Sequence, residues 1–199
     1  QHTDLNFHGK HQRIIAFWLL TGVLMIIIQV LLGGITRLTG SGLSITDWDP
    51  IMGIVPPLTH EDWSVVFQKY QETPQSQIVN SSFTLTDFKE IFFWEWFHRF
   101  WARLLGFVFL LPFVFFTVKK WFTHSMIKPM IILFLLGALQ GLVGWIMVAS
   151  GLSGDNVSVN YYKLAIHFIS AMVLLCYTLW FALSLLFVDR QRTYSPGLR

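Results

Sequence analysis

Charged side chains are scarce in this sequence of 199 residues, where Asp, Glu, Lys and Arg together make up 13%. A soluble domain carries about a quarter. Apolar residues supply 54% and gather into four runs, each of about twenty residues or more, which is the length needed to cross a hydrocarbon layer about 30 Å thick. This composition excludes a water-soluble globule and predicts an all-α integral membrane protein with four transmembrane helices.

Cysteine is almost absent, because Cys176 in the fourth apolar run is the single one. An intrachain disulfide and a thiolate metal cluster are therefore both excluded, and any metal must be held by other ligands. The formal net charge of +3 does not indicate nucleic acid, because the basic residues form short clusters beside the apolar runs. Such clusters orient a protein in a membrane.

The predicted spans cover residues 14–38, 91–118, 127–149 and 161–188 of a single membrane domain, residues 1–199. A long outer loop, residues 39–90, joins the first two spans. Eight basic residues lie on the opposite side: Lys10, Arg13, Lys119, Lys120, Lys128, Arg190, Arg192 and Arg199. By the positive-inside rule both termini are expected on the cytoplasmic side of a bacterial membrane, or on the matrix side of the mitochondrial inner membrane.

The outer loop is too aromatic for a solvated linker, since it carries Trp48, Trp63, Phe67, Tyr70 and Phe83. Turns are indicated at Asp49-Pro50 and Pro56-Pro57. We expect the loop to be ordered and to cover the outer end of the helices.

A weak internal repeat divides the spans into two pairs. The first span ends in Gln29-Val-Leu-Leu-Gly33 followed by Ser41-Gly-Leu-Ser44, and the third in Gln140-Gly-Leu-Val-Gly144 followed by Ser150-Gly-Leu-Ser153. In each copy an outward helix is followed by a turn and an inward helix. The repeat predicts a pseudo-symmetric four-helix bundle built from two copies of one helical hairpin.

Polar residues within spans are costly and usually face the interior, so they are the best guide to function. Here they are Gln29, Glu95, His98, Arg99, Arg103, Gln140 and His167. The two histidines stand six or seven residues into parallel helices, about 10 Å below the outer surface at 1.5 Å per residue. Equal depth predicts a shared ligand, and the alternative is a pair of buried histidines bonded to backbone carbonyls.

Haem suits this pair better than a bare zinc or copper ion, which would need a third or fourth ligand where only Glu95 is nearby. Aromatic residues crowd the second span, and glycines on the first and third spans allow close approach of a flat macrocycle or a helix. Arg37, Arg99 and Arg103 have the fork that suits haem propionates. Anchoring at the membrane interface is an equal alternative for Arg37.

Glu95 precedes His98 by one helical turn and so lies on the same face. It could accept a proton or stabilise positive charge, or only form a helix-surface ion pair with Arg99. The other histidines are predicted to lie in tails or at the surface: His2, His8, His11, His60 and His124.

With these residues in view, the chain resembles the haem A synthase family over the region from about Ile14 to the end of the fourth span. The matching stretches are Gly33-Gly-Ile-Thr-Arg-Leu-Thr-Gly-Ser-Gly-Leu-Ser44, Asp47-Trp48 with Pro50, Pro56-Pro57, Phe88-Lys-Glu-Ile-Phe-Phe-Trp-Glu-Trp-Phe-His-Arg99, Leu139-Gln-Gly-Leu-Val-Gly-Trp-Ile-Met-Val-Ala-Ser-Gly-Leu152 and Leu164-Ala-Ile-His167. With Cys176 as its single cysteine, the chain is similar to the branch of the family that has no cysteine pair in the outer loops.

The resemblance implies an oxidoreductase that converts a methyl group of haem O to a formyl group, giving haem A for terminal oxidases. His98 and His167 match the histidine pair of the amino-terminal half, where substrate haem is processed, and Glu95 matches the carboxylate before the first of them. A second four-helix half carries haem B in that family. Here the second half would be supplied either by the rest of a longer polypeptide, which we favour, or by a second copy of this chain in a homodimer. Haem O synthase and a terminal oxidase are the partners that the resemblance implies.

Two further functions stay open at the level of sequence. A bis-histidine membrane cytochrome b would need the same two imidazoles to carry electrons, and a non-catalytic haem chaperone or assembly subunit would need them to hold haem. Glu95 beside His98 and the large outer loop favour the enzyme, because an electron carrier needs neither.

Overall fold

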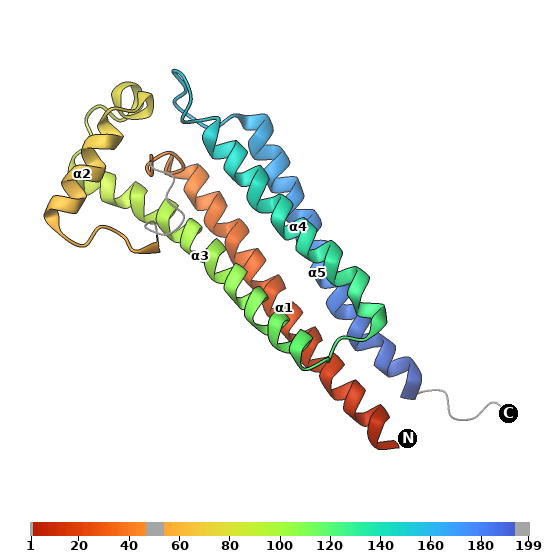
Figure 1. The fold of residues 1–199 in the computed structure, drawn as a ribbon. Coiled ribbons are helices and arrows are strands. Elements are labelled where there is room, and N and C mark those ends of the chain that lie inside the picture. The colour runs from red at the N-terminus through yellow and green to blue at the C-terminus, as the bar shows by residue number, and fades with distance from the viewer. Residues whose placement is uncertain (1, 47–53, 194–199) are drawn as a thin grey trace. The chain divides into compact units, whose positions relative to one another are not determined.

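The fold is entirely helical in the parts of the chain that the computed structural model describes, residues 2–46 and 54–193. The long helices are α1 (His2–Leu38), α3 (Leu85–Val118), α4 (His124–Ala149) and α5 (Tyr161–Thr193), and between α1 and α3 lie α2 (His60–Gln71) and the π-helix η2 (Gln75–Val79) (Figure 1). Four of these helices are long and apolar enough to cross a membrane. The predicted all-α membrane fold is confirmed.

The membrane helices are longer than the apolar runs from which they were predicted. The portions suited to a membrane are Gly9–Leu38, Leu85–Val118, His124–Ala149 and Tyr161–Phe187. Helices α1 and α5 continue beyond these portions at their polar ends, because backbone hydrogen bonding does not stop where hydrocarbon ends. Asp47, Trp48, Asp49 and Pro50, which belong to the sequence motifs, and Arg199 lie outside the described residues.

The chain forms two compact units, and the first comprises residues 1–27, 105–139 and 170–199. Its helices are joined by side-chain hydrogen bonds to backbone carbonyls: Gln12 donates to Leu185 at 3.0 Å, and Trp18 donates to Val108 at 2.8 Å. His11, expected in a solvated tail, is instead 8% exposed and stacks on Trp121 with 4.0 Å between ring centroids. The expectation for His11 was wrong, because helix α1 continues through this segment and carries the ring onto the indole.

The second unit, residues 28–104 and 140–169, contains the other ends of the four long helices together with α2 and η2. Helix α1 ends at Leu38, and Gly40 follows it with a φ of 67°, the left-handed conformation that terminates many helices. The Ser41 amide reaches back to the Thr36 carbonyl at 3.0 Å and the Gly40 amide to Arg37 at 3.4 Å. This Schellman cap reverses the chain just before Ser41-Gly-Leu-Ser44.

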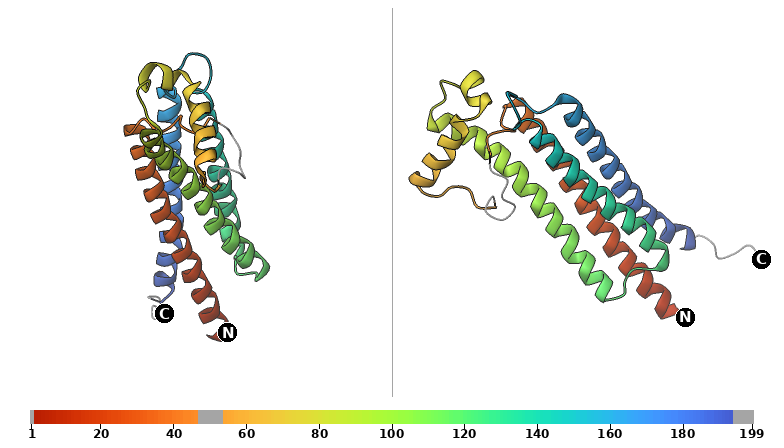
Figure 2. Two further views of the ribbon diagram at one scale, coloured as in Figure 1. Left: turned by 90° about the vertical axis from the view of Figure 1, so that its left-hand side faces the viewer. Right: turned by 45° about the horizontal axis from the view of Figure 1, so that its top comes forward.

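Helix α2 lies beside the start of α3 (Figures 1 and 2), and aromatic side chains of the two helices pack together. The buried centre is Tyr70, Phe88, Ile91 and Phe92, and neighbouring rings such as Trp63 and Phe67 surround it. Thr59 and Asp62 form a capping box that starts α2, and the bonds from Thr59 lower the pKa of Asp62. Sequestering these rings from water fixes α2 against α3.

A buried polar chain then ties this layer to the end of α1. The Tyr70 hydroxyl bonds to Gln75 Oε1 at 3.4 Å and receives a bond from Asn80 at 2.7 Å, while Gln75 Nε2 donates to the Gly40 carbonyl at 2.8 Å. Burial raises the pKa of Tyr70, so the phenol stays protonated and able to donate. The part of the segment near Gln75 is therefore tied to Gly40, at the start of the segment.

We expect Gln75→Leu to loosen this segment, because it leaves the buried Tyr70 hydroxyl and Gly40 carbonyl short of partners, at a cost of about 1–3 kcal/mol. Limited proteolysis should cut residues 54–84 faster in this variant. Gln77→Leu is the control, because Gln77 is exposed. Equal cleavage of the two variants would contradict a holding role for Gln75.

Candidate functional site

Two glutamines on membrane helices each donate to the backbone carbonyl of a histidine on the next membrane helix. Gln29 Nε2 on α1 lies 3.2 Å from the His98 carbonyl on α3, and Gln140 Nε2 on α4 lies 3.2 Å from the His167 carbonyl on α5. Gln140 Nε2 is also 3.2 Å from His167 Nδ1. The contacts repeat as the sequence does, which supports the predicted pair of hairpins.

A glycine faces the imidazole in both copies. A Cβ placed on Gly33 would lie 3.3 Å from His98 Nε2, and one on Gly144 would lie 2.7 Å from His167 Cε1. Each glycine follows its glutamine by four residues, so both stand on the same face of their helix. The Gln-x-x-x-Gly spacing therefore lets the glutamine reach the histidine backbone while the ring lies against a helix that has no side chain there.

The two copies meet at the turns that follow the glycines. The Leu43 side chain, 3% exposed, approaches Gly151 so closely that a Cβ on this glycine would stand 2.7 Å from Leu43 Cδ2. Leu43 and Gly151 both belong to Ser-Gly-Leu-Ser turns. His98 and His167 lie in the same unit.

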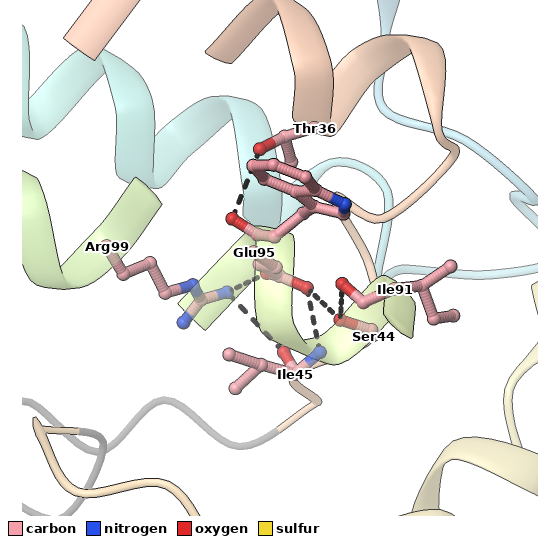
Figure 3. A network of polar contacts seen from close by, with 7 residues as sticks. Thr36, Ser44, Ile45, Ile91, Glu95 and Arg99 are labelled. Atoms are coloured by element: carbon pink, nitrogen blue, oxygen red, sulfur yellow. Dashed lines mark hydrogen bonds and ion pairs between the residues drawn. The ribbon is translucent and has the colours of Figure 1, made fainter. Parts of the chain in front are cut away.

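Glu95 is 2% exposed and its two carboxylate oxygens serve different partners (Figure 3). Oε2 accepts from the Ser44 hydroxyl at 2.7 Å and from the Ile45 amide at 2.9 Å, while Oε1 faces Arg99 at 2.5 Å. Arg99 also reaches the Ile45 carbonyl at 3.5 Å. Glu95 thus accepts from the Ile45 amide, and its partner Arg99 donates to the Ile45 carbonyl.

The ion pair considered from sequence therefore exists, but not at an exposed helix surface. The carboxylate is almost fully enclosed, and the Arg99 side chain is 20% exposed. Nearby, the Thr36 hydroxyl reaches the Trp94 carbonyl at 3.4 Å (Figure 3). Three bonds to one buried carboxylate fix the turn after α1 onto α3.

The other two arginines proposed for propionates differ in burial. Arg37 stands exposed in the last turn of α1, and Arg103 is half-buried on α3. Both belong to the unit that holds the histidines. Arg99 faces Glu95 and Ile45 through one guanidinium nitrogen, Nη2.

The donor set of this unit suits haem better than a bare metal ion. Within residues 2–46 and 54–193 there is no group of three or more His, Cys, Asp and Glu side chains placed to hold a metal ion. Two imidazoles suffice for the axial positions of haem iron. Gly33 and Gly144 leave room for both rings against the facing helices, and the two imidazoles lie in one unit, so the residues present fit that group.

Sequence reasoning missed three parts of this arrangement. It named Gln29 and Gln140 as buried polar residues without finding their partners, it treated the glycines as a general approach surface, and it gave Ser44 and Ile45 no role. The repeat was the available signal for the glutamines and glycines, because it places Gln, Gly and a following His alike in both copies. Nothing in the sequence signals the bond from the Ile45 backbone.

Comparison with known proteins adds an independent line of observation. The family model described as cytochrome oxidase assembly protein (COX15-CtaA) matches residues 16–199. The chain is 45% identical over 184 residues to a haem A synthase of Flavobacterium johnsoniae, covering 92% of this chain and 54% of that protein. It is 46% identical over 191 residues to the haem A synthase of Granulibacter bethesdensis, covering 96% and 51%.

The haem A synthase of Nitrosospira multiformis is 44% identical over 199 residues, covering 100% of this chain and 55% of that protein. The chain thus spans about half the length of the curated relatives it matches. No solved structure matches it significantly.

We expect Gly144→Ala to displace the His167 ring, because the new methyl group would lie 2.7 Å from Cε1. Overpacking of this kind costs about 1–3 kcal/mol, so the thermal unfolding midpoint of the purified protein should fall. Gly141→Ala is the matched control on the same helix, because nothing lies within 4 Å of its Cβ position. A midpoint for Gly144→Ala as high as that of Gly141→Ala would show that the ring does not depend on this glycine.

Proposed function

Because the chain belongs to the cytochrome oxidase assembly protein family, represented by the match over residues 16–199, we propose that it forms the substrate half of a haem A synthase. The reaction oxidises a methyl group of haem O to a formyl group. The relatives named haem A synthase are about twice as long. The proposal assigns this chain the part that binds and positions haem O.

The observation that carries this proposal is the repeated placement of Gln, Gly and His in one unit. His98 and His167 would hold the substrate porphyrin through its iron, which supplies the redox chemistry when bound. The glycine opposite each imidazole leaves room for the ring against the facing helix, and the glutamines fix the histidine backbones. In a membrane, where polar groups need internal partners, such contacts hold ligands in place.

Glu95 would serve as the acid–base or charge-stabilising group of the reaction. It stands one turn from His98, is almost fully buried and accepts bonds from Ser44 and Ile45. An ionised carboxylate near the porphyrin edge would stabilise positive charge that develops as a methyl group is oxidised. To take up a proton, it would first exchange one of its bonds to Ser44, Ile45 or Arg99.

Arg37, Arg99 and Arg103 would receive the propionates of the substrate. A guanidinium group presents five donors in a planar fork that suits carboxylates. Arg99 would do so with the nitrogens other than Nη2, which faces Glu95 and Ile45. Holding the propionates at one end sets which methyl group of the ring lies nearest Glu95.

The oxidation also requires an oxygen atom, for which water is the simplest donor, and releases protons together with electrons that must leave the substrate site. Haem B would serve this purpose as redox cofactor, bound in a second four-helix half or in a second copy of this chain. Haem O synthase as supplier of the substrate and a terminal oxidase as recipient of the product complete the proposed partners.

A bis-histidine cytochrome b that only carries electrons is the second candidate, favoured by the pairing of two imidazoles across helices. It gives no role to the buried carboxylate or to the ordered segment over residues 54–84. The haem extracted from the protein separates the candidates: haem O or a hydroxylated derivative supports the enzyme, and haem B alone supports the carrier.

We further propose that the loop between α1 and α3 faces the periplasm, or its mitochondrial equivalent, and that both termini face the cytoplasm or matrix. Lys119 and Lys120 follow α3, at the end of that helix away from the loop. In a Cys176→Ser background, Ser82→Cys should react with an impermeant thiol reagent added outside intact cells. Lys119→Cys should react only after the cytoplasmic face is opened, and the reverse result would invert the topology.

Glu95→Gln is expected to retain haem and to block formation of the formyl product. The amide keeps the size of the side chain but removes the charge, and acid–base catalysis contributes about 10²- to 10⁴-fold in rate. Haem A and its hydroxylated precursor would be measured by mass spectrometry in cells that have no other copy of the enzyme.

His98→Ala and His167→Ala are the comparison in the same experiment, because each should reduce haem content rather than only product. Wild-type levels of haem A from Glu95→Gln would contradict the catalytic role and leave Glu95 with a structural role only. Normal haem binding and turnover in both histidine variants would remove the ligand assignment.

A further inference from the structure

The two glutamine–histidine pairs are alike in the backbone but not at the ring. Gln29 and Gln140 each donate to a histidine carbonyl at 3.2 Å. Gln140 alone adds a contact to an imidazole, with Nε2 at 3.2 Å from His167 Nδ1. Among the described residues no hydrogen bond reaches the ring of His98, and Gln29 Oε1 is buried without a partner.

The backbone contact fixes which way the Gln140 amide points. A carbonyl oxygen can only accept, so the group facing the His167 carbonyl must be the NH₂ of the amide and not its oxygen. The same nitrogen faces Nδ1. An amide nitrogen has hydrogens to donate and no lone pair available to accept, so Nδ1 must be the acceptor.

This assignment determines where neutral His167 carries its proton. If Nδ1 accepts, the hydrogen is on Nε2. An imidazole binds iron through a nitrogen lone pair, and in this arrangement Nε2 has none while that of Nδ1 points to Gln140. To bind a metal through Nε2, the ring must move its proton to Nδ1, which places two N–H groups face to face and breaks the Gln140 contact.

We propose that Gln140 is a positioning residue that holds His167 in the Nε2–H form, so that Gln140 competes with any metal for this histidine. His98 has no such competitor and is the ready ligand. The part of this inference that concerns haem rests on the proposed function: haem would be held firmly on the His98 side, and its His167 side would open more easily to an exogenous ligand.

The first test needs no haem. In protein with ¹⁵N-labelled histidine, the His167 resonances, assigned by their loss in His167→Ala, should show a protonated Nε2 and an unprotonated Nδ1. Gln140→Leu removes the donor, so the proton should redistribute between the nitrogens. The Leu variant should still fold, because the His167 carbonyl lies inside helix α5 and keeps its helical hydrogen bond.

Gln140→Glu gives the opposite bias, because a carboxylate accepts from Nδ1–H. Gln29→Leu is the matched control in the other copy and should leave the His167 proton where it is. A proton on Nδ1 in the parent protein, or an unchanged ratio in both Gln140 variants, would overturn the proposal. A protein that binds no haem would remove the proposed function and leave this tautomer test intact.

The second test uses the haem-loaded protein. Carbon monoxide binds reduced haem by replacing the weaker axial ligand. Gln140→Leu should make His167 harder to replace, lowering the apparent affinity for carbon monoxide roughly two- to tenfold, which is the net effect of one hydrogen bond. Gln29→Leu should change it less. Equal affinities for the parent protein and Gln140→Leu would show that Gln140 does not compete for His167.

Discussion

A polar side chain on a membrane helix must find its hydrogen-bond partner within the protein, because hydrocarbon offers none. Gln29 and Gln140 meet this constraint by donating to the backbone of the neighbouring membrane helix at the level of a histidine. Each bond sets the register of one helix against the next. The glycine four residues later then receives the imidazole, so each glutamine and its glycine act on the same histidine.

Glu95 meets the same constraint in another way. Its carboxylate is buried, and it takes its partners from the turn after α1 as well as from its own helix. The bonds from Ser44 and Ile45 tie the start of the outer segment to α3, and Gln75 ties a later part of that segment to Gly40. A charge that the proposed chemistry requires therefore also holds the chain that surrounds it.

The near-symmetry of the two hairpins also shows where they differ. Both copies supply a glutamine, a glycine and a histidine, but among the hydrogen bonds of the described residues Gln140 reaches the ring of its histidine and Gln29 reaches only the backbone. Glu95 has no carboxylate counterpart before His167, where the sequence reads Leu164-Ala-Ile. The two hairpins of the duplicated scaffold therefore differ through a few side chains while their backbone contacts stay alike.

The sequence by itself determined the four spans and the hairpin repeat, because hydrophobic length and helical spacing are local properties. It also predicted an equal depth for His98 and His167 in the membrane. Only the tertiary structure decided which groups meet. Glu95 accepts from Ile45, 50 residues away in the chain, and His11 stacks on Trp121 rather than lying in a solvated tail. Such contacts join residues far apart in sequence, and a backbone amide as donor leaves no mark on residue type, so no local pattern could have predicted them.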